Sequence, residues 1–256
     1  MAKMLTLRRH HSETVMPNIH PADNGDVYVS GAATLREIAG DPAIQSSYPL
    51  LADACSSPDA HDRDESLSEN IATPSACVRT ADGVACALNG GAACAAADPS
   101  SDLHAIIDGG PCWRAYTSLP GVALHALDAV VEYGNDDRAG AMQRVRLPAD
   151  AARGFQRLFR PAAGHAPDAA HITLAAVRRA DGDVRLVLGG VAPRPYRIYT
   201  SVEEEAMAGG LDEDTIAGLA ERALLDAESH AASANRVDVA TALLRGAIAE
   251  IDASSR

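Results

Sequence analysis

The chain has 256 residues, of which 47% are apolar and 22% charged, a composition typical of a globular protein long enough to bury a sizeable core. Its formal net charge of −13 argues against a nucleic-acid partner, because a phosphate-binding surface needs clustered basic residues. The sequence contains no run of 18 apolar residues, and residues 1–25 lack an apolar secretion-signal segment, so we expect a cytoplasmic protein with no membrane contact.

The N-terminal part of the chain predicts short elements between polar segments. Residues 1–26 are expected to be irregular, and residues 56–70 form a charged, serine-rich stretch without apolar periodicity. Between them, the apolar pattern predicts a strand at 26–30 and helices at 34–39 and 49–55. The acidic residues around the histidine of the 56–70 stretch could bind a metal, but alternating charges are more typical of a solvated loop.

The middle of the chain predicts a sheet. The pattern indicates a helix at 122–129, followed by a strand at 129–133 whose partner is 143–147. Two further apolar runs, 172–178 and 184–188, flank an Asp-Gly pair that supplies the positive φ angles of a tight hairpin turn. We therefore expect one sheet spanning roughly residues 128–190.

The C-terminal part predicts helices that cover this sheet. Ser201 and Glu204 have the spacing of a capping box, and Asn235 is positioned to cap a later helix. Apolar residues recur at helical spacing in 216–227 and again in 240–251, so each helix presents one apolar face. The expected class is α+β, with helices layered on one side of the sheet.

The five cysteines are unequally distributed. Nothing in the sequence indicates export and their number is odd, so a disulfide framework is not expected. Three of them, Cys77, Cys86 and Cys94, lie within 18 residues, a spacing that can hold a metal. The alternative is that they pack as small apolar side chains.

The C-terminal half contains a phrase that resembles a known family. Residues 188–197 (LGGVAPRPYR) and 235–247 (NRVDVATALLRGA) are similar to the C-terminal domain of the FAD-binding, medium subunit of xanthine dehydrogenase-type molybdenum hydroxylases. Upstream, residues 30–38 and 48–54 resemble the stretch that leads into the second flavin-binding segment of that family. The similar phrases occur in the family's order across residues 27–250.

This resemblance implies a fold and a domain organisation. After the irregular residues 1–26, residues 27–133 would form a truncated FAD-binding, PCMH-like α+β domain that includes a cysteine-containing loop at 71–97. Residues 134–256 would form an antiparallel sheet packed by helices, similar to the C-terminal domain of CO dehydrogenase flavoproteins.

The cysteine loop resembles that of a subgroup with an inserted segment that holds a [4Fe–4S] cluster. In this subgroup a C-x7-C with an internal Gly-Gly contributes ligands, and the present chain has this pattern at 86–94. The resemblance implies Cys77, Cys86 and Cys94 as ligands. Four thiolates usually hold such a cluster, so the fourth ligand is left open between Cys112, Cys55 and an outside group.

Three departures from the family concern the flavin. Residues 1–26 lack the glycine-rich A-G-G-T loop whose amides bind the FAD pyrophosphate, and contain only Gly25. The second flavin loop is reduced to 71–75, where Pro74 removes an amide donor, and an aspartate of the family is lost at 118–120. We therefore expect a degenerate FAD site. The candidate cofactor contacts that remain are Thr73, Ser75, Ser118, Gly189 and Gly190.

Other candidate side chains have simpler explanations. The imidazoles of His104, His125, His165 and His171 could act as general bases, but no G-x-S-x-G motif accompanies them, and packing explains them as well. Trp113 and Tyr116 could stack on a ring, although core positions are the default for so few aromatic residues. Gly189 and Gly190 could also simply end a strand where small residues are needed.

Two functions follow from these expectations. The first is an electron-transfer subunit with FAD, partnered by a large molybdopterin subunit and a small [2Fe–2S] subunit. The second is a flavin-free protein of the same fold, with a structural or interaction role or with a cleft reused for another small molecule. A homo-oligomer is compatible with either.

Overall fold

The computed structural model of the chain describes residues 17–57, 64–72, 96, 101, 104–107, 114–115, 118–134, 142–161, 171–227 and 234–254. Several predicted site residues lie outside this part of the chain, and their placement stays a prediction: Thr73, Ser75, Cys77, Cys86, Cys94, Cys112, Trp113, Tyr116 and His165.

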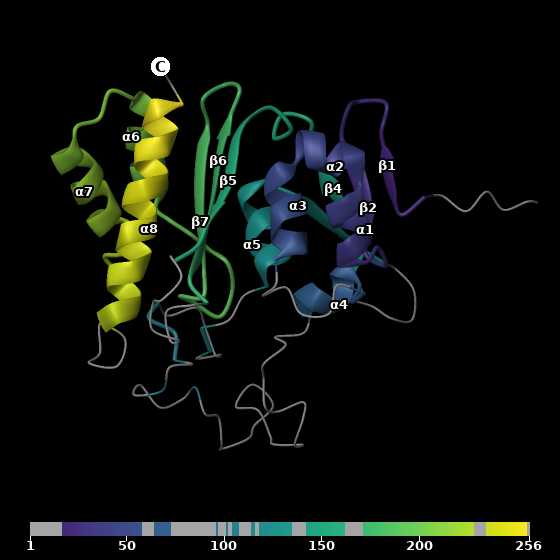
Figure 1. Cartoon of the computed structure of the whole chain (residues 1–256), viewed down its shortest axis with the longest axis horizontal. Coiled ribbons are helices and arrows are strands. Elements are labelled where there is room, and N and C mark those ends of the chain that lie inside the picture. Colours follow the sequence, from purple (N-terminus) through teal and green to yellow (C-terminus); the bar gives the residue numbers. More distant parts are fainter. Residues whose placement is uncertain are drawn as a thin grey trace, which may run out of the picture.

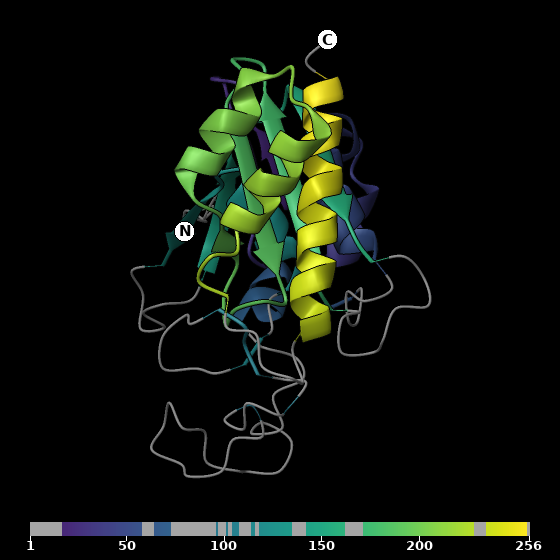
Figure 2. The same cartoon turned by 90° about the vertical axis from the view of Figure 1, so that its left-hand side faces the viewer.

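The described elements stack as alternating layers of helices and sheets (Figure 1). Helices α6 (Thr200–Ala208), α7 (Glu213–Arg222) and α8 (Ala234–Ala253) form one outer layer, which faces the viewer in Figure 2 and covers a sheet. Behind that sheet lie further helices, and beyond them lies the other sheet. Both sheets are antiparallel, so the predicted α+β class is confirmed.

The first sheet is built mostly from the N-terminal half and has the strand order β1-β2-β4-β3. Its strands are β1 (Ile19–Pro21), β2 (Val27–Ser30), β3 (Val130–Tyr133) and β4 (Met142–Leu147). The predicted pairing of β3 with β4 is confirmed, but the expectation of one sheet over 128–190 is wrong, because β4 pairs on its other side with β2. Val27 opposite Leu147 and Val29 opposite Val145 point their buried side chains to the helical layer, which fixes this register.

Five described helices precede the strand β3. They are α1 (Leu35–Gly40), α2 (Pro42–Ser47), α3 (Pro49–Ser56), α4 (Leu67–Ala72) and α5 (Leu119–Ala126). Helices α2 and α4 were not expected from sequence. Asp41 looked like part of a helix stop, yet its side chain accepts hydrogen bonds from the N–H groups of Ala43 and Ile44 and so begins α2.

The second sheet contains β5 (Gly154–Phe159), β6 (Thr173–Arg179), β7 (Val184–Gly189) and β8 (Tyr196–Arg197), in this order. The predicted hairpin of β6 and β7 is confirmed. Its turn has a positive φ only at Gly182 (+96°), and not at Asp181. The strands β6 and β7 are buried on both faces, because helices cover each side, and this explains their nearly continuous apolar sequence.

The C-terminal helices pack as their apolar spacing predicts. Buried residues of α8 and of the α7 region join the outer face of the second sheet in one core cluster. The predicted capping box is wrong, because α6 begins at Thr200, after the N-cap residue Tyr199, and no side chain caps it. Asn235 likewise lies within α8 and not before it.

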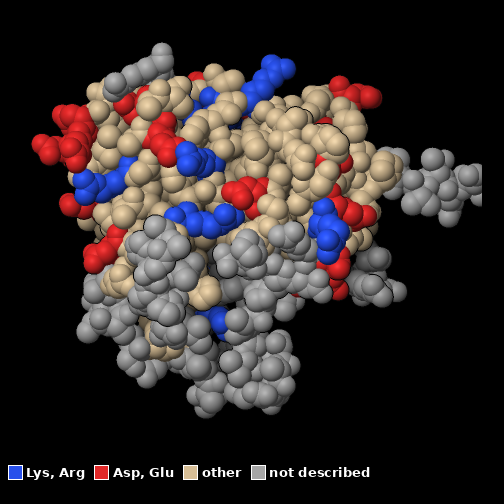
Figure 3. Space-filling model, in the orientation of Figure 1, with Lys and Arg blue, Asp and Glu red and all other residues tan. Residues whose placement is uncertain are grey.

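The surface of the described part carries mixed charge. On the face drawn in Figure 3, basic and acidic side chains of the described residues are interspersed. Among the described residues, no helix has both the length and the apolar character that crossing a membrane requires.

Candidate functional site

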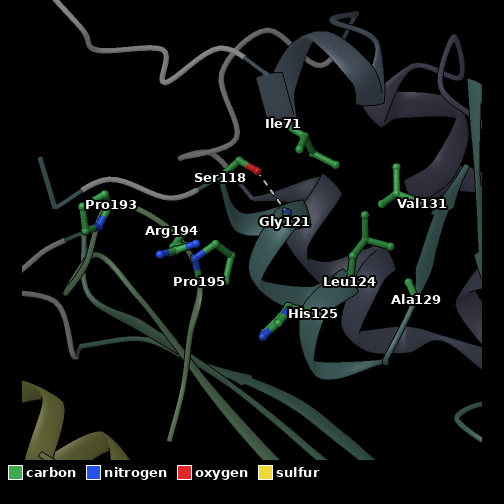
Figure 4. A pocket seen from close by; sticks show the side chains of 10 residues that line it. All are labelled: Ile71, Ser118, Gly121, Leu124, His125, Ala129, Val131, Pro193, Arg194 and Pro195. Carbon is green, nitrogen blue, oxygen red and sulfur yellow. Dashed lines mark hydrogen bonds between the residues drawn. The ribbon is translucent and has the colours of Figure 1, made fainter. Parts of the chain in front are cut away.

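A pocket of about 340 Å³ lies between the two halves of the chain (Figure 4). Helix α5 forms its floor, and the turn that follows β7 forms one wall. The opposite wall comes from α4 and from the start of β3. The lining residues are Ile71, Ser118, Gly121, Leu124, His125, Ala129, Val131, Pro193, Arg194 and Pro195.

The floor is set by the way α5 begins. Ser118 is the N-cap, and its Oγ accepts a hydrogen bond of 3.0 Å from the N–H of Gly121. Pro120 follows in the first turn, where its missing N–H costs nothing. Because Ser118, Gly121 and His125 are spaced by three and four residues, they share the face of α5 that looks into the pocket.

The turn after β7 needs glycine at a specific position. Gly190 has a φ of +77°, and a Cβ there would lie 2.3 Å from the carbonyl oxygen of His171. The carbonyl of Val191 then accepts hydrogen bonds from the N–H groups of Ile106 and Ile107, which hold the turn. This geometry directs Pro193, Arg194 and Pro195 toward α5.

The two walls differ in character. Ile71, Leu124 and Val131 gather on one side of the pocket and present hydrocarbon to it. Arg194 and Pro195 lie on the other side, above the ring of His125. The polar side chains of the pocket are therefore Ser118, His125 and Arg194.

Burial and the nearby cations favour the neutral form of the His125 imidazole. Partial burial of the imidazole, and then the cations Arg197 and Arg185, lower the pKa of His125, while Asp128 acts in the opposite direction. At neutral pH the ring therefore offers one N–H donor and one acceptor nitrogen.

The cations beside the pocket are held by ion pairs, and the carboxylate of one pair, Glu203, is buried. Arg197 donates to Glu203 of α6 at 2.6 Å, and the same carboxylate accepts the N–H of Leu186 at 2.9 Å. Arg185 bridges to Asp128, the residue with a φ of +58° that follows α5. These contacts fix the end of α5 against β7 and so fix the depth of the pocket.

The structure brings together only part of the predicted site. Ser118 lines the pocket. Gly189 ends β7 and Gly190 begins the turn that follows it, and neither glycine lines the pocket. His104 is elsewhere, with its Nδ1 at 2.6 Å from the carbonyl of Ala96, and His171 is exposed at the start of β6. Arg194 and its flanking prolines were part of the recognised phrase but were not expected as site residues.

The described residues do not fit FAD as a whole. In the N-terminal turn at 22–26, backbone amides already donate to carbonyls of the same turn: the N–H of Gly25 to Ala22 and the N–H of Ala22 to Asp26. No free cradle of amides for a pyrophosphate is therefore present in this turn. Near the pocket, Pro193 and Pro195 carry no N–H, and a cavity of about 340 Å³ is at the low end for any drug-sized ligand.

The described residues also offer no metal site. Among them, no group of three or more His, Cys, Asp or Glu side chains is placed to hold an ion. Cys55 is buried in the first core, and burial raises the pKa of its thiol to about 12, so it is protonated and unsuited to bind metal. The proposed cluster ligands at Cys77, Cys86 and Cys94 fall outside the described residues.

Comparison with known proteins supports the fold. No family model matches the sequence, and no curated protein matches it. The solved structures include quinoline 2-oxidoreductase from Pseudomonas putida 86, with 20% identity over 92% of this chain and 77% of that chain and a TM-score of 0.52.

Two CO dehydrogenases are similar to the same extent. The enzyme from Hydrogenophaga pseudoflava, which lacks the Mo-pyranopterin moiety of its cofactor, has 17% identity and a TM-score of 0.52. The reconstituted enzyme from Oligotropha carboxidovorans has 15% identity and a TM-score of 0.54, and both matches cover 92% of this chain and 78% of the other. This chain has the fold of a chain of these oxidoreductases. At such identities the similarity concerns the fold and does not extend to activity.

Proposed function

We propose that this chain is a homologue of the medium subunit of molybdenum hydroxylases that has kept the fold and the cleft but not the FAD site. In this proposal the pocket between α5 and the turn at 193–195 binds a small molecule in place of the flavin. The fold shared with quinoline 2-oxidoreductase and CO dehydrogenase supports the first part.

One observation carries the second part. The pocket combines Ile71 and Ser118, from two segments that resemble flavin-binding elements of the family, with the turn after Gly189 and Gly190, which belongs to the phrase that resembles its C-terminal domain. In this proposal the pocket is the remnant of the flavin cleft; in its support, the turn at 22–26 offers no free amide cradle, and Pro193 and Pro195 line the pocket. A small ligand fits such a site better than a dinucleotide, which must also anchor a pyrophosphate.

The second candidate is an electron-transfer subunit that retains FAD. The shared fold favours it, and its partners would be a large molybdopterin subunit and a small [2Fe–2S] subunit. In that case Thr73, Ser75 and Ser118 would contact the flavin, and Gly189 and Gly190 would allow the backbone to approach it.

A flavin titration separates the two candidates. The full chain is purified, its visible spectrum is recorded, and FAD is then added while flavin fluorescence is followed. We expect no flavin bands and no saturable quenching by FAD. A stoichiometric flavin spectrum, or tight saturable binding of FAD, would overturn the flavin-free proposal and support the electron-transfer subunit.

The cluster is tested on the same sample. If Cys77, Cys86 and Cys94 bind a [4Fe–4S] cluster, anaerobic reconstitution with iron and sulfide gives a broad shoulder near ~400 nm that dithionite bleaches. Cys86→Ser then abolishes the shoulder, whereas Cys55→Ser, at a buried thiol far from these residues in sequence, leaves it intact. A shoulder unchanged in Cys86→Ser would refute the assignment.

A further inference from the structure

The pocket has a charge character opposite to that of the chain. The sequence carries 35 acidic and 22 basic residues, yet none of the described residues that line the pocket is acidic. Its ionisable side chains are Arg194 and His125. An anionic ligand would therefore meet no negative charge from these lining residues, although the protein as a whole is acidic.

The polar and apolar groups are also separated in space. Arg194 and His125 lie on one side of the pocket, and Ile71, Leu124 and Val131 lie on the other (Figure 4). A ligand that fills such a pocket has an apolar body on one side and one anionic group on the other. Pro193 and Pro195 also line the pocket, and its volume of about 340 Å³ suits a small ring-bearing molecule.

The guanidinium of Arg194 is suited to a carboxylate. Arginine has five N–H donors in a planar fork, a geometry that matches the two oxygens of a carboxylate. The neutral imidazole of His125 adds a single N–H donor from the floor. Asp128, which follows α5, accepts from Arg179 and Arg185 and is not among the lining residues.

We propose that the pocket binds a compact ring-bearing carboxylate, with its ring against Ile71, Leu124 and Val131 and its carboxylate at Arg194 and His125. This inference rests on the proposed function, because it names the class of small molecule that occupies the former flavin cleft.

The test compares a charged probe with its neutral isostere. Calorimetric titration of the full chain at pH 7 with 2-naphthoate and 2-naphthamide measures the contribution of the carboxylate. We expect 2-naphthoate to bind roughly tenfold more tightly, the effect of one charge-assisted hydrogen bond at a partly exposed site.

Two variants localise the effect. Arg194→Gln is expected to remove most of the advantage of 2-naphthoate while leaving 2-naphthamide unchanged, and Arg153→Gln, at another exposed arginine, is the matched control that changes neither. Ala129→Leu fills the pocket and is expected to weaken both probes, with its folding checked by thermal melting.

The outcomes separate the inference from the proposed function. Equal affinity for both probes, or no effect of Arg194→Gln, overturns the carboxylate assignment and leaves a small-molecule pocket in place. Absence of binding by both probes also overturns the inference, and the flavin titration then decides the proposed function independently. Binding of FAD in place of either probe overturns both.

Discussion

At the scale of single residues, a few buried polar side chains fix the joins between elements. Asp26 is 5% exposed, and its carboxylate accepts hydrogen bonds from the N–H of Ala149, from Asn24 and from Arg146. Tyr48 is fully buried and donates its hydroxyl to the carbonyls of Leu147 and Pro148. Both side chains thus tie distant segments to the end of β4.

Removal of the Asp26 carboxylate should destabilise the protein in a pH-dependent way. The N–H of Ala149, and then Asn24 and Arg146, hold the pKa of Asp26 below its usual value in spite of burial. The stabilisation is therefore present above the unfolded-state pKa of about 3.9 and is lost as the pH falls through the lower native-state pKa.

We expect Asp26→Ala to lower the free energy of unfolding by about 1–3 kcal/mol at pH 7, measured by urea denaturation, because it leaves the partly buried amide of Ala149 without its acceptor. The difference from wild type should shrink as the pH is lowered below about 4. Asp23→Ala, at an exposed carboxylate three residues earlier, is the control and should have little effect. A difference that stays constant down to acidic pH would contradict the role given to the charge.

At the scale of elements, the turn after β7 is the feature that creates the pocket wall. Gly190 turns the chain at a positive φ beside the carbonyl of His171, and the carbonyl of Val191 receives two N–H groups from 106–107. The ion pair of Glu203 with Arg197 then holds β8 and α6 against β7. The position of 193–195 therefore depends on the backbone and not on side-chain packing alone.

A pair of glycine substitutions tests this role. Gly190→Ala should destabilise the protein by about 2 kcal/mol or more, because the new Cβ meets a backbone oxygen at a φ that alanine rarely adopts. Gly246→Ala should instead stabilise it by about 0.5–1 kcal/mol, because this residue lies within α8 and a Cβ there meets nothing within 4 Å. Chemical denaturation measures both changes. A Gly190→Ala variant as stable as the wild type would refute the argument for the turn.

At the scale of the whole molecule, the two sheets share a helical layer. The core cluster of the first sheet includes Ala175, Val177 and Val187, which belong to the second sheet and face α3 and α5. The other faces of β6 and β7 pack against α6–α8. The pocket lies in this shared layer, so it exists only when both halves are folded together.

This arrangement predicts a single cooperative unfolding transition. Val187→Ala removes buried contact between the halves and should lower the free energy of unfolding by about 1–4 kcal/mol, without separating the transition into two steps. Scanning calorimetry checks this by comparing the calorimetric and van't Hoff enthalpies. Two resolved transitions in the wild type would show that the halves fold independently and would remove the basis for a rigid pocket between them.

Local sequence determined the type of most elements. The apolar runs 172–178 and 184–188, the Asp-Gly turn between them and the helical spacing in 240–251 depend on neighbours in the chain, so the hairpin and the helix could be predicted and are confirmed. Helices α2 and α4 escaped prediction because they are six residues long and lie in polar stretches where no periodicity can develop.

The tertiary structure alone decided the division into two sheets and the composition of the pocket. The partner of β4 was ambiguous in sequence, since its apolar alternation suits either sheet, and the burial of Val145 and Leu147 against the helical layer resolved it. Arg194 joins Ser118 and His125 across about seventy residues of chain only because Gly190 turns the backbone toward α5. Sequence spacing carries information about neighbours along the chain, whereas a pocket depends on contacts between segments that only the folded chain brings together.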